Sequence, residues 1–279
     1  MDNWLSRLSP RTAEVNLRIL SAFMEWLREN GGRFRDFTPD ELVEFQISAS
    51  NHERFALLDL VQRWVSGLDL RHHTKVKYYT TIRSFFLHNR AELPRDPSFR
   101  IRGAKPKVVG DLTVEELRQI VLSSNRLHRA IFMCMFQGGM GIGELLWWNL
   151  HGYDSLMQQL REEPEVIKIE LPGRKKAKFE KPYYTLIGPD AIRCLKDYLD
   201  HRKQPKGPEK AIFINQYGKP VTEEGIRIYW LRRLKALGII KPKKDKYGSI
   251  RYGKNIHELR DLFRSQWEKS PAKGSVAEF

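Results

Sequence analysis

The chain has 279 residues, of which 41% are hydrophobic, enough to form one large or two ordinary globular domains. No apolar run reaches the length of a membrane span, and the N-terminus lacks the charged-then-apolar layout of a secretory signal. The two cysteines, Cys134 and Cys194, lie far apart in apolar helical patterns, so we expect reduced core residues of a cytoplasmic protein and no structural zinc.

The charge of the chain is strongly positive and unevenly distributed. The net charge is +15; residues 1–103 carry 16 Lys and Arg against 13 Asp and Glu, and residues 104–279 carry 33 against 21. A basic chain of this kind most often binds nucleic acid, although a solvated basic surface would explain the charge as well. The charge alone leaves both interpretations open.

Residues 1–87 predict a small bundle of four helices, with no strand. Ser9-Pro10 is a helix start, and Thr38-Pro39 combines an N-cap residue with a proline in the first turn of a second helix. A third helix is expected over about 55–65 and a fourth from Thr74. The stretch after residue 88, up to about 111, is rich in Pro, Gly and basic residues and predicts a linker.

The fourth helix carries basic side chains that we expect to point outward, namely Lys75, Lys77 and Arg83. They are candidate contacts to nucleic-acid phosphates. A solvated helix face fits them equally well.

Residues 129–150, RAIFMCMFQGGMGIGELLWWNL, predict the centre of the larger domain. Residues 130–136 are apolar nearly all the way round, which is typical of a helix buried on every face. Four glycines then interrupt the pattern, and Glu144 opens a second apolar run. The glycines fit neither GxGxxG, whose third glycine would fall on Glu144, nor GxxxxGK[ST]. We therefore interpret them as a turn between two buried helices.

The period of the sequence changes after a polar spacer at 151–164. Residues 166–171 alternate like a half-buried strand, and residues 183–187 are β-branched and aromatic, which predicts a hairpin. Its loop is strongly cationic and includes Arg174, Lys175, Lys176 and Lys178. Taken alone, such a loop is a solvated turn as readily as a nucleic-acid contact.

The last third of the chain predicts a helix at 189–201, a short strand at 211–214 and a helix after Thr222. On the helix after Thr222 we expect three arginines to face largely outward, Arg227, Arg232 and Arg233. A last helix is expected to begin near Ile256 and to open with His257 and Arg260.

This order of elements resembles the tyrosine site-specific recombinases, the phage-integrase-like enzymes that break and rejoin DNA. MFQGGMGIGELLWWNL matches the family box TGLRxxEL, and IHELRDLF matches the box HxLRHxF. The resemblance implies a mainly α fold with a small β-hairpin sheet, in the α+β class. It implies a SAM-like helical core-binding domain in residues 1–103, with the linker from about 88, and a catalytic domain in residues 112–279.

The resemblance also implies roles for single residues. Arg260 would hold the scissile phosphate, and His257 would assist proton transfer and contact the same phosphate. Glu144 matches the acidic residue three positions after the family's first arginine. The hairpin lysine that protonates the leaving 5′ oxygen maps to Lys175, with the next two lysines of the loop as alternatives. No metal or cofactor is implied.

The sequence departs from the family pattern at two places. The first arginine of the TGLRxxEL box falls on Gly141, and no tyrosine follows Arg260, where the family has its nucleophile. We therefore expect a truncated recombinase that is inactive as given. The alternative is a catalytically inactive DNA-binding protein on a recombinase scaffold.

The expected partner is double-stranded DNA, clamped between the two domains, with a homotetramer on paired sites and no membrane. The expected location is the cytoplasm, associated with the nucleoid. An RNA-binding or architectural helical protein is a third possibility.

Overall fold

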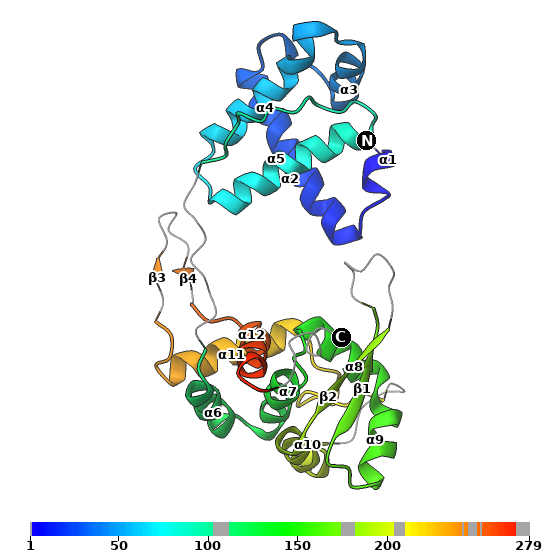
Figure 1. Cartoon of the computed structure of the whole chain (residues 1–279), viewed down its shortest axis with the longest axis vertical. Coiled ribbons are helices and arrows are strands. Elements are labelled where there is room, and N and C mark those ends of the chain that lie inside the picture. The colour runs from blue at the N-terminus through cyan, green and yellow to red at the C-terminus, as the bar shows by residue number, and fades with distance from the viewer. Residues whose placement is uncertain are drawn as a thin grey trace. The chain divides into compact units, whose positions relative to one another are not determined.

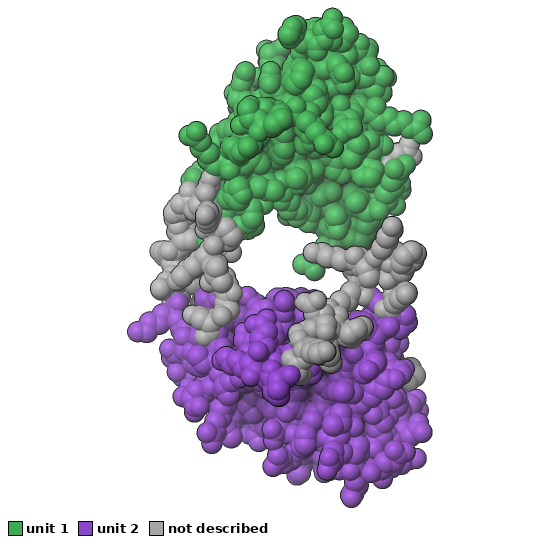
Figure 2. Space-filling view, viewed as in Figure 1, with its two compact units in different colours: residues 1–108 green, residues 109–279 purple. Residues whose placement is uncertain are grey.

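The structure is a computed structural model of the chain, and it describes residues 2–102, 112–173, 182–203, 210–241, 243–244, 250–251 and 253–271. The chain forms two compact units, residues 1–108 and residues 109–279, which Figure 2 distinguishes by colour. Each unit has its own hydrophobic core. We describe them separately.

Unit 1 is helical throughout the part that the structure describes (Figure 1). In chain order its elements are α1 (Asp2–Leu5), α2 (Pro10–Asn30), the short 3-10 helices η1 (Gly32–Phe34) and η2 (Asn51–Phe55), which flank α3 (Pro39–Ser48), then α4 (Ala56–Gly67) and α5 (His72–His88). Thr38 is the N-cap of α3, as expected, and it forms a capping box with Glu41: Thr38 accepts from the Glu41 N–H, and the Glu41 carboxylate accepts from the Thr38 N–H at 2.6 Å.

One of the basic side chains expected on the outside of α5 lies inside the bundle. Lys75 is only 9% exposed, and its ammonium donates to the Ser66 carbonyl, near the end of α4, at 3.1 Å. The prediction of an outward Lys75 is therefore wrong. Lys75 lies seven residues, or two helical turns, before the buried Ile82 and therefore on the same face of α5. The aliphatic part of the Lys75 side chain packs inward, and its ammonium group reaches a backbone carbonyl. Lys77 is exposed, as expected.

Arg83 also forms hydrogen bonds within unit 1, and its partners lie in the stretch that the sequence predicted to be a linker. Its guanidinium donates to the carbonyls of Leu93 (2.9 Å) and Pro94 (2.8 Å). Ala91 and Leu93 are buried in the core of unit 1. The start of the predicted linker, from 88, is therefore part of the folded unit, and the prediction of an outward Arg83 is wrong.

Unit 2 places a two-stranded antiparallel sheet among helices (Figure 1). Its elements are α6 (Val114–Ser123), α7 (Arg126–Gln137), α8 (Ile142–His151), α9 (Tyr153–Arg161), β1 (Ile167–Leu171), β2 (Tyr183–Ile187), α10 (Pro189–His201), α11 (Glu223–Ala236), β3 (Lys243–Lys244), β4 (Ile250–Arg251) and α12 (Glu258–Glu268). In the sheet Ile167 pairs with Ile187 and Leu171 with Tyr183. The α+β prediction is confirmed.

The apolar stretch and its glycines form the predicted turn between buried helices. α7 and α8 meet at 113° across residues 138–141, and both contribute to the core of unit 2. Among the described residues, no single helix has the length and apolarity to cross a membrane; only this bent pair does, by length and composition.

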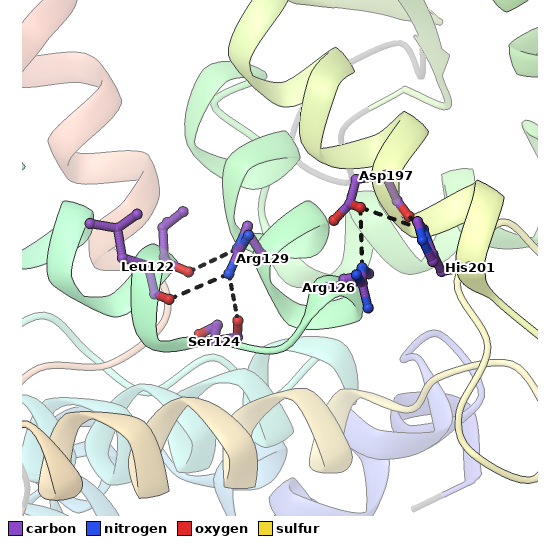
Figure 3. Close-up of polar contacts among 7 residues, drawn as sticks. Leu122, Ser124, Arg126, Arg129, Asp197 and His201 are labelled. Atoms are coloured by element: carbon purple, nitrogen blue, oxygen red, sulfur yellow. Dashed lines mark hydrogen bonds and ion pairs between the residues drawn. The ribbon is translucent and has the colours of Figure 1, made fainter.

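Figure 3 shows how side chains at the start of α7 fix it to its neighbours. Arg129 donates to three carbonyls at the end of α6, where a helix leaves its last carbonyls unpaired: those of Val121, Leu122 and Ser124. Arg126 pairs with Asp197 of α10 at 3.1 Å, and the same carboxylate lies 3.5 Å from His201. These contacts join α7 to α6 and to α10.

Two expectations for unit 2 are wrong. The polar spacer contains α9, whose Leu156 is buried and whose other side chains are largely polar. The expected strand at 211–214 is buried but forms only one isolated bridge, between Ile214 and Pro220. A side chain takes the place of a neighbouring strand, because Asn149 accepts from the Phe213 N–H and donates to the Phe213 carbonyl.

Candidate functional site

The glycine turn lets α12 approach the centre of unit 2 closely. Gly139 has φ +55°, and a Cβ atom there would lie 2.6 Å from the ring of Phe263 on α12. Only a glycine accepts both the backbone conformation and the ring. The helix that carries Arg260 therefore packs directly against the turn before α8.

Glu144, in the first turn of α8, joins three parts of unit 2. Its carboxylate accepts from the Gly141 N–H at 2.6 Å and from Arg260 Nη1 at 3.1 Å. It also accepts from the hydroxyl of Tyr183, at the start of β2. The Glu144 side chain is 19% exposed and that of Arg260 is 30% exposed. The guanidinium is thus anchored on one edge and has further N–H donors for a ligand.

Tyr183 is a residue of this site that sequence reasoning missed. It is a strand residue, as expected, but its hydroxyl reaches the carboxylate that holds Arg260. The only sequence signal is its position, immediately after the cationic loop of the hairpin. Its hydroxyl restrains Glu144 and so acts on Arg260 indirectly.

His257 lies at the N-cap position of α12, three residues before Arg260. Its backbone N–H donates to Asn255 Oδ1 at 2.8 Å, and its side chain is exposed. Side chains three apart lie on the same helix face, so the imidazole and the Arg260 guanidinium face the same way. On the other side of the imidazole, Nε2 lies 3.5 Å from Nη2 of Arg227, which α11 carries.

The loop before His257 is fastened to α6 by an ion pair. Lys254 Nζ lies 2.6 Å from both carboxylate oxygens of Glu116, and the two side chains are 11% and 25% exposed. Glu116 is also the capping-box residue of α6, where it accepts from the Thr113 N–H. Burial raises the pKa of Glu116, but the hydrogen bonds from Lys254 and Thr113 outweigh it, so the pKa is lowered overall.

We expect Lys254→Met to lower the free energy of unfolding by about 2 kcal/mol at pH 7, because it leaves a largely buried carboxylate without its cation. A lowered pKa in the folded state means that the pair stabilises fully above 4.5, the ordinary pKa of Glu116, and less as the pH falls through the lowered value. Urea unfolding should therefore show the cost shrinking as the pH falls below 4.5.

The control for this prediction is Lys210→Met, which removes an equally short but exposed pair, 2.8 Å from Asp154. Exposed pairs contribute about 0–1 kcal/mol, so this change should have little effect. Equal losses in both variants, or a Lys254→Met cost that does not change with pH, would contradict the account.

Gly141 borders the same site. It has an ordinary extended conformation, with φ −75° and ψ 162°, so any residue could adopt it. A Cβ atom there would lie 3.5 Å from Glu144 Oε2 and 3.6 Å from Arg260 Nη1, which is ordinary contact. The position accepts a Cβ atom, and a side chain there would start beside Arg260.

The remaining candidate residues are placed less centrally. Arg232 is exposed on α11. Arg233 is half-buried: its Nη2 donates to the Tyr229 hydroxyl at 3.1 Å, and its guanidinium lies 5.4 Å from that ring. The hairpin residues Arg174, Lys175, Lys176 and Lys178 lie outside the described residues. Their loop joins β1 and β2 at the Leu171–Tyr183 pair, so the chain enters and leaves it next to the site.

The site thus combines a guanidinium and an imidazole on one helical turn, with a second guanidinium beside the imidazole. Such donors bind an oxyanion with charge-assisted hydrogen bonds. Held in place before the ligand arrives, they also stabilise charge that develops on the ligand during a reaction. Within the described residues, no cluster of His, Cys, Asp or Glu could hold a metal ion.

Comparisons with known proteins agree with this architecture. The tyrosine recombinase XerC of Lactobacillus delbrueckii subsp. bulgaricus is 25% identical over 269 residues, covering 91% of this chain and 78% of its own. The XerC of Lacticaseibacillus casei is 24% identical over 233 residues, covering 78% and 69%. No family model matches the chain.

Two solved structures share the fold. The Tn1549 transposon integrase in complex with circular intermediate DNA covers 94% of this chain and 90% of its own, with a TM-score of 0.59 and 14% identity. A lambda integrase dimer bound to a core site covers 100% and 93%, with a TM-score of 0.53 and 16% identity. The fold is that of integrase-type recombinases. In sequence the chain is similar to the tyrosine recombinases, and in fold it is similar to the integrases.

Proposed function

We propose that this chain binds double-stranded DNA and that Arg260 and His257 hold one phosphate of the DNA backbone. The observation that carries the proposal is the anchoring of Arg260 by Glu144, on the same turn of α12 as an exposed imidazole. A basic residue held in this way pays little entropy when a phosphate binds. The net charge of +15 favours the same partner.

The reaction that fits this site is the breaking and rejoining of DNA. In such a step a tyrosine oxygen, which no residue after Arg260 in this sequence supplies, attacks the phosphorus, a phosphotyrosine bond forms, and the bond to the 5′ oxygen breaks. Arg260 and His257 would stabilise the charge on the non-bridging oxygens, and Lys175 would protonate the leaving oxygen. In support, both integrase structures above are of proteins bound to DNA. Assembly as a homotetramer on paired sites is part of the same proposal.

A second candidate function is binding without catalysis. It is favoured by Gly141, which leaves the family's first arginine position without a charge. Trapping on a nicked duplex separates the two candidates when the chain used supplies a tyrosine after Arg260, because this sequence has none there and would form no adduct under either candidate. A covalent protein–DNA adduct on a denaturing gel supports the enzyme; binding without an adduct, in that chain and in its Gly141→Arg variant alike, supports the binder.

The salt dependence of duplex binding tests the proposal as a whole. We expect the affinity for a 30-base-pair duplex, followed by fluorescence anisotropy, to fall steeply as salt is raised, because bound phosphates release counterions. Arg260→Ala should weaken binding about tenfold and reduce the slope against log salt by about one.

The control variant is Arg193→Ala. Arg193 is exposed on α10 and forms a surface pair with Asp190, so its loss should change affinity little. Binding that does not respond to salt, or no binding at all, would contradict the proposed function.

A further inference from the structure

The proposed phosphate site has one arginine fewer than the two family boxes would supply. The family box places an arginine at position 141, and here that residue is a glycine. Arg260 alone would then supply guanidinium donors from the two boxes. A phosphate that becomes more negatively charged during reaction is better stabilised by two such groups than by one.

Arg227 lies where a second guanidinium could serve the same phosphate. Its Nη2 is 3.5 Å from Nε2 of His257. The buried stripe of α11 explains this position, because Ile226, Trp230 and Leu234 fix one face of the helix and Arg227 follows Ile226 at the edge of that face. Its side chain is 40% exposed, so a ligand can reach it.

Both arginines are paired with a carboxylate in a way that leaves donors for an anion. Arg227 pairs with Glu223 at 2.7 Å, one turn earlier on α11, and Arg260 pairs with Glu144 at 3.1 Å. Each carboxylate holds one guanidinium in place without blocking all five of its N–H donors.

We infer that Arg227 supplies the second guanidinium of the phosphate site and so takes the part that an arginine at position 141 would play. This inference rests on the proposed function. It assigns to α11 a group that the family box places before α8. Arg227 would contact a non-bridging oxygen of the phosphate that Arg260 and His257 hold.

The simplest alternative is that Arg227 forms only a surface ion pair with Glu223. Pairs four residues apart on a helix stabilise it only slightly and have no link to position 141. The two interpretations therefore differ in one respect: only a phosphate contact by Arg227 can be replaced by an arginine introduced at residue 141.

The test is a rescue experiment with the 30-base-pair duplex. Arg227→Ala should weaken binding about five- to tenfold and reduce the salt slope by about one. Adding Gly141→Arg to Arg227→Ala should restore both quantities. Adding Gly143→Arg instead should restore neither, although it adds the same charge two residues away, at an exposed position where a Cβ atom meets nothing within 4 Å.

The outcomes separate this inference from the proposed function. Wild-type affinity in Arg227→Ala, or equal rescue by both added arginines, overturns the assignment of Arg227 while leaving duplex binding intact. Failure of the wild-type chain to bind duplex overturns the proposed function and this inference with it. Circular dichroism and thermal unfolding of each variant confirm that a loss of binding is not a loss of fold.

Discussion

Replacing Gly139 with alanine is expected to lower the free energy of unfolding by about 3 kcal/mol. Two costs add up: an alanine in the left-handed conformation, about 1–2 kcal/mol, and a Cβ atom forced against the ring of Phe263, about 1–3 kcal/mol. The ring belongs to α12, so relief of the clash moves the helix that carries Arg260. Duplex binding should therefore weaken along with stability.

The matched control for this change is Gly143→Ala, four residues further on. There an added Cβ meets no atom within 4 Å, and the residue lies in the first turn of α8. Alanine is the better helix former by about 1 kcal/mol, so this variant should be as stable as the natural chain or more so. Chemical denaturation of the full chain compares the two. Similar stabilities of the two variants would show that α12 does not rest on Gly139.

The second large effect is expected from Asn149→Leu. Asn149 is completely buried, and its amide satisfies the N–H of Phe213 at 2.5 Å and its carbonyl at 3.2 Å. Leucine has a similar volume but leaves the buried Phe213 N–H without a partner, at about 1–3 kcal/mol, while the Phe213 carbonyl keeps the Val221 N–H at 3.2 Å. We expect a loss of about 2 kcal/mol in the free energy of unfolding.

Asn30→Leu is the control for that substitution. Asn30 is exposed at the end of α2 and donates to a carbonyl of its own helix, that of Trp26. Water can replace this bond, so the change should stay within about 0.5 kcal/mol. If Asn149→Leu is as mild as this control, residues 211–214 are not held by the Asn149 amide.

Local signals in the sequence predicted much of the fold. Thr38 is the N-cap of α3, the helix at 189–201 has the predicted bounds, and the alternation of 167–171 appears as a strand with every second residue buried. These features depend on residues close together in the chain. Spacing and chemistry within a few residues therefore suffice to predict them.

The errors arose where a distant partner decides the structure. The sequence pattern predicts Lys75 and Arg83 as surface residues. In the structure Lys75 bonds to the Ser66 carbonyl of the neighbouring helix, and Arg83 bonds to residues 93–94, which fold back onto α5. A short apolar run such as 211–214 favours a strand, but separate groups rather than a neighbouring strand supply most of its hydrogen bonds, among them the Asn149 amide, the Tyr198 hydroxyl and the Val221 N–H. Neither the sequence spacing nor the residue type contains that information.

The candidate site shows the same division. The three-residue spacing of His257 and Arg260 predicts a shared helix face, and the position of Glu144 follows from its motif. The hydroxyl of Tyr183 on Glu144 and the approach of Arg227 to His257 depend on how β2 and α11 pack. No local pattern marks either residue as part of a site.

The position of a backbone phosphate in a structure of this protein bound to duplex DNA tests the central claim most directly. We expect one phosphate to accept hydrogen bonds from Arg260 and His257, at about 2.7–3.2 Å, while Glu144 still holds the guanidinium. A duplex bound elsewhere, with both side chains facing solvent, would contradict the assignment of this site.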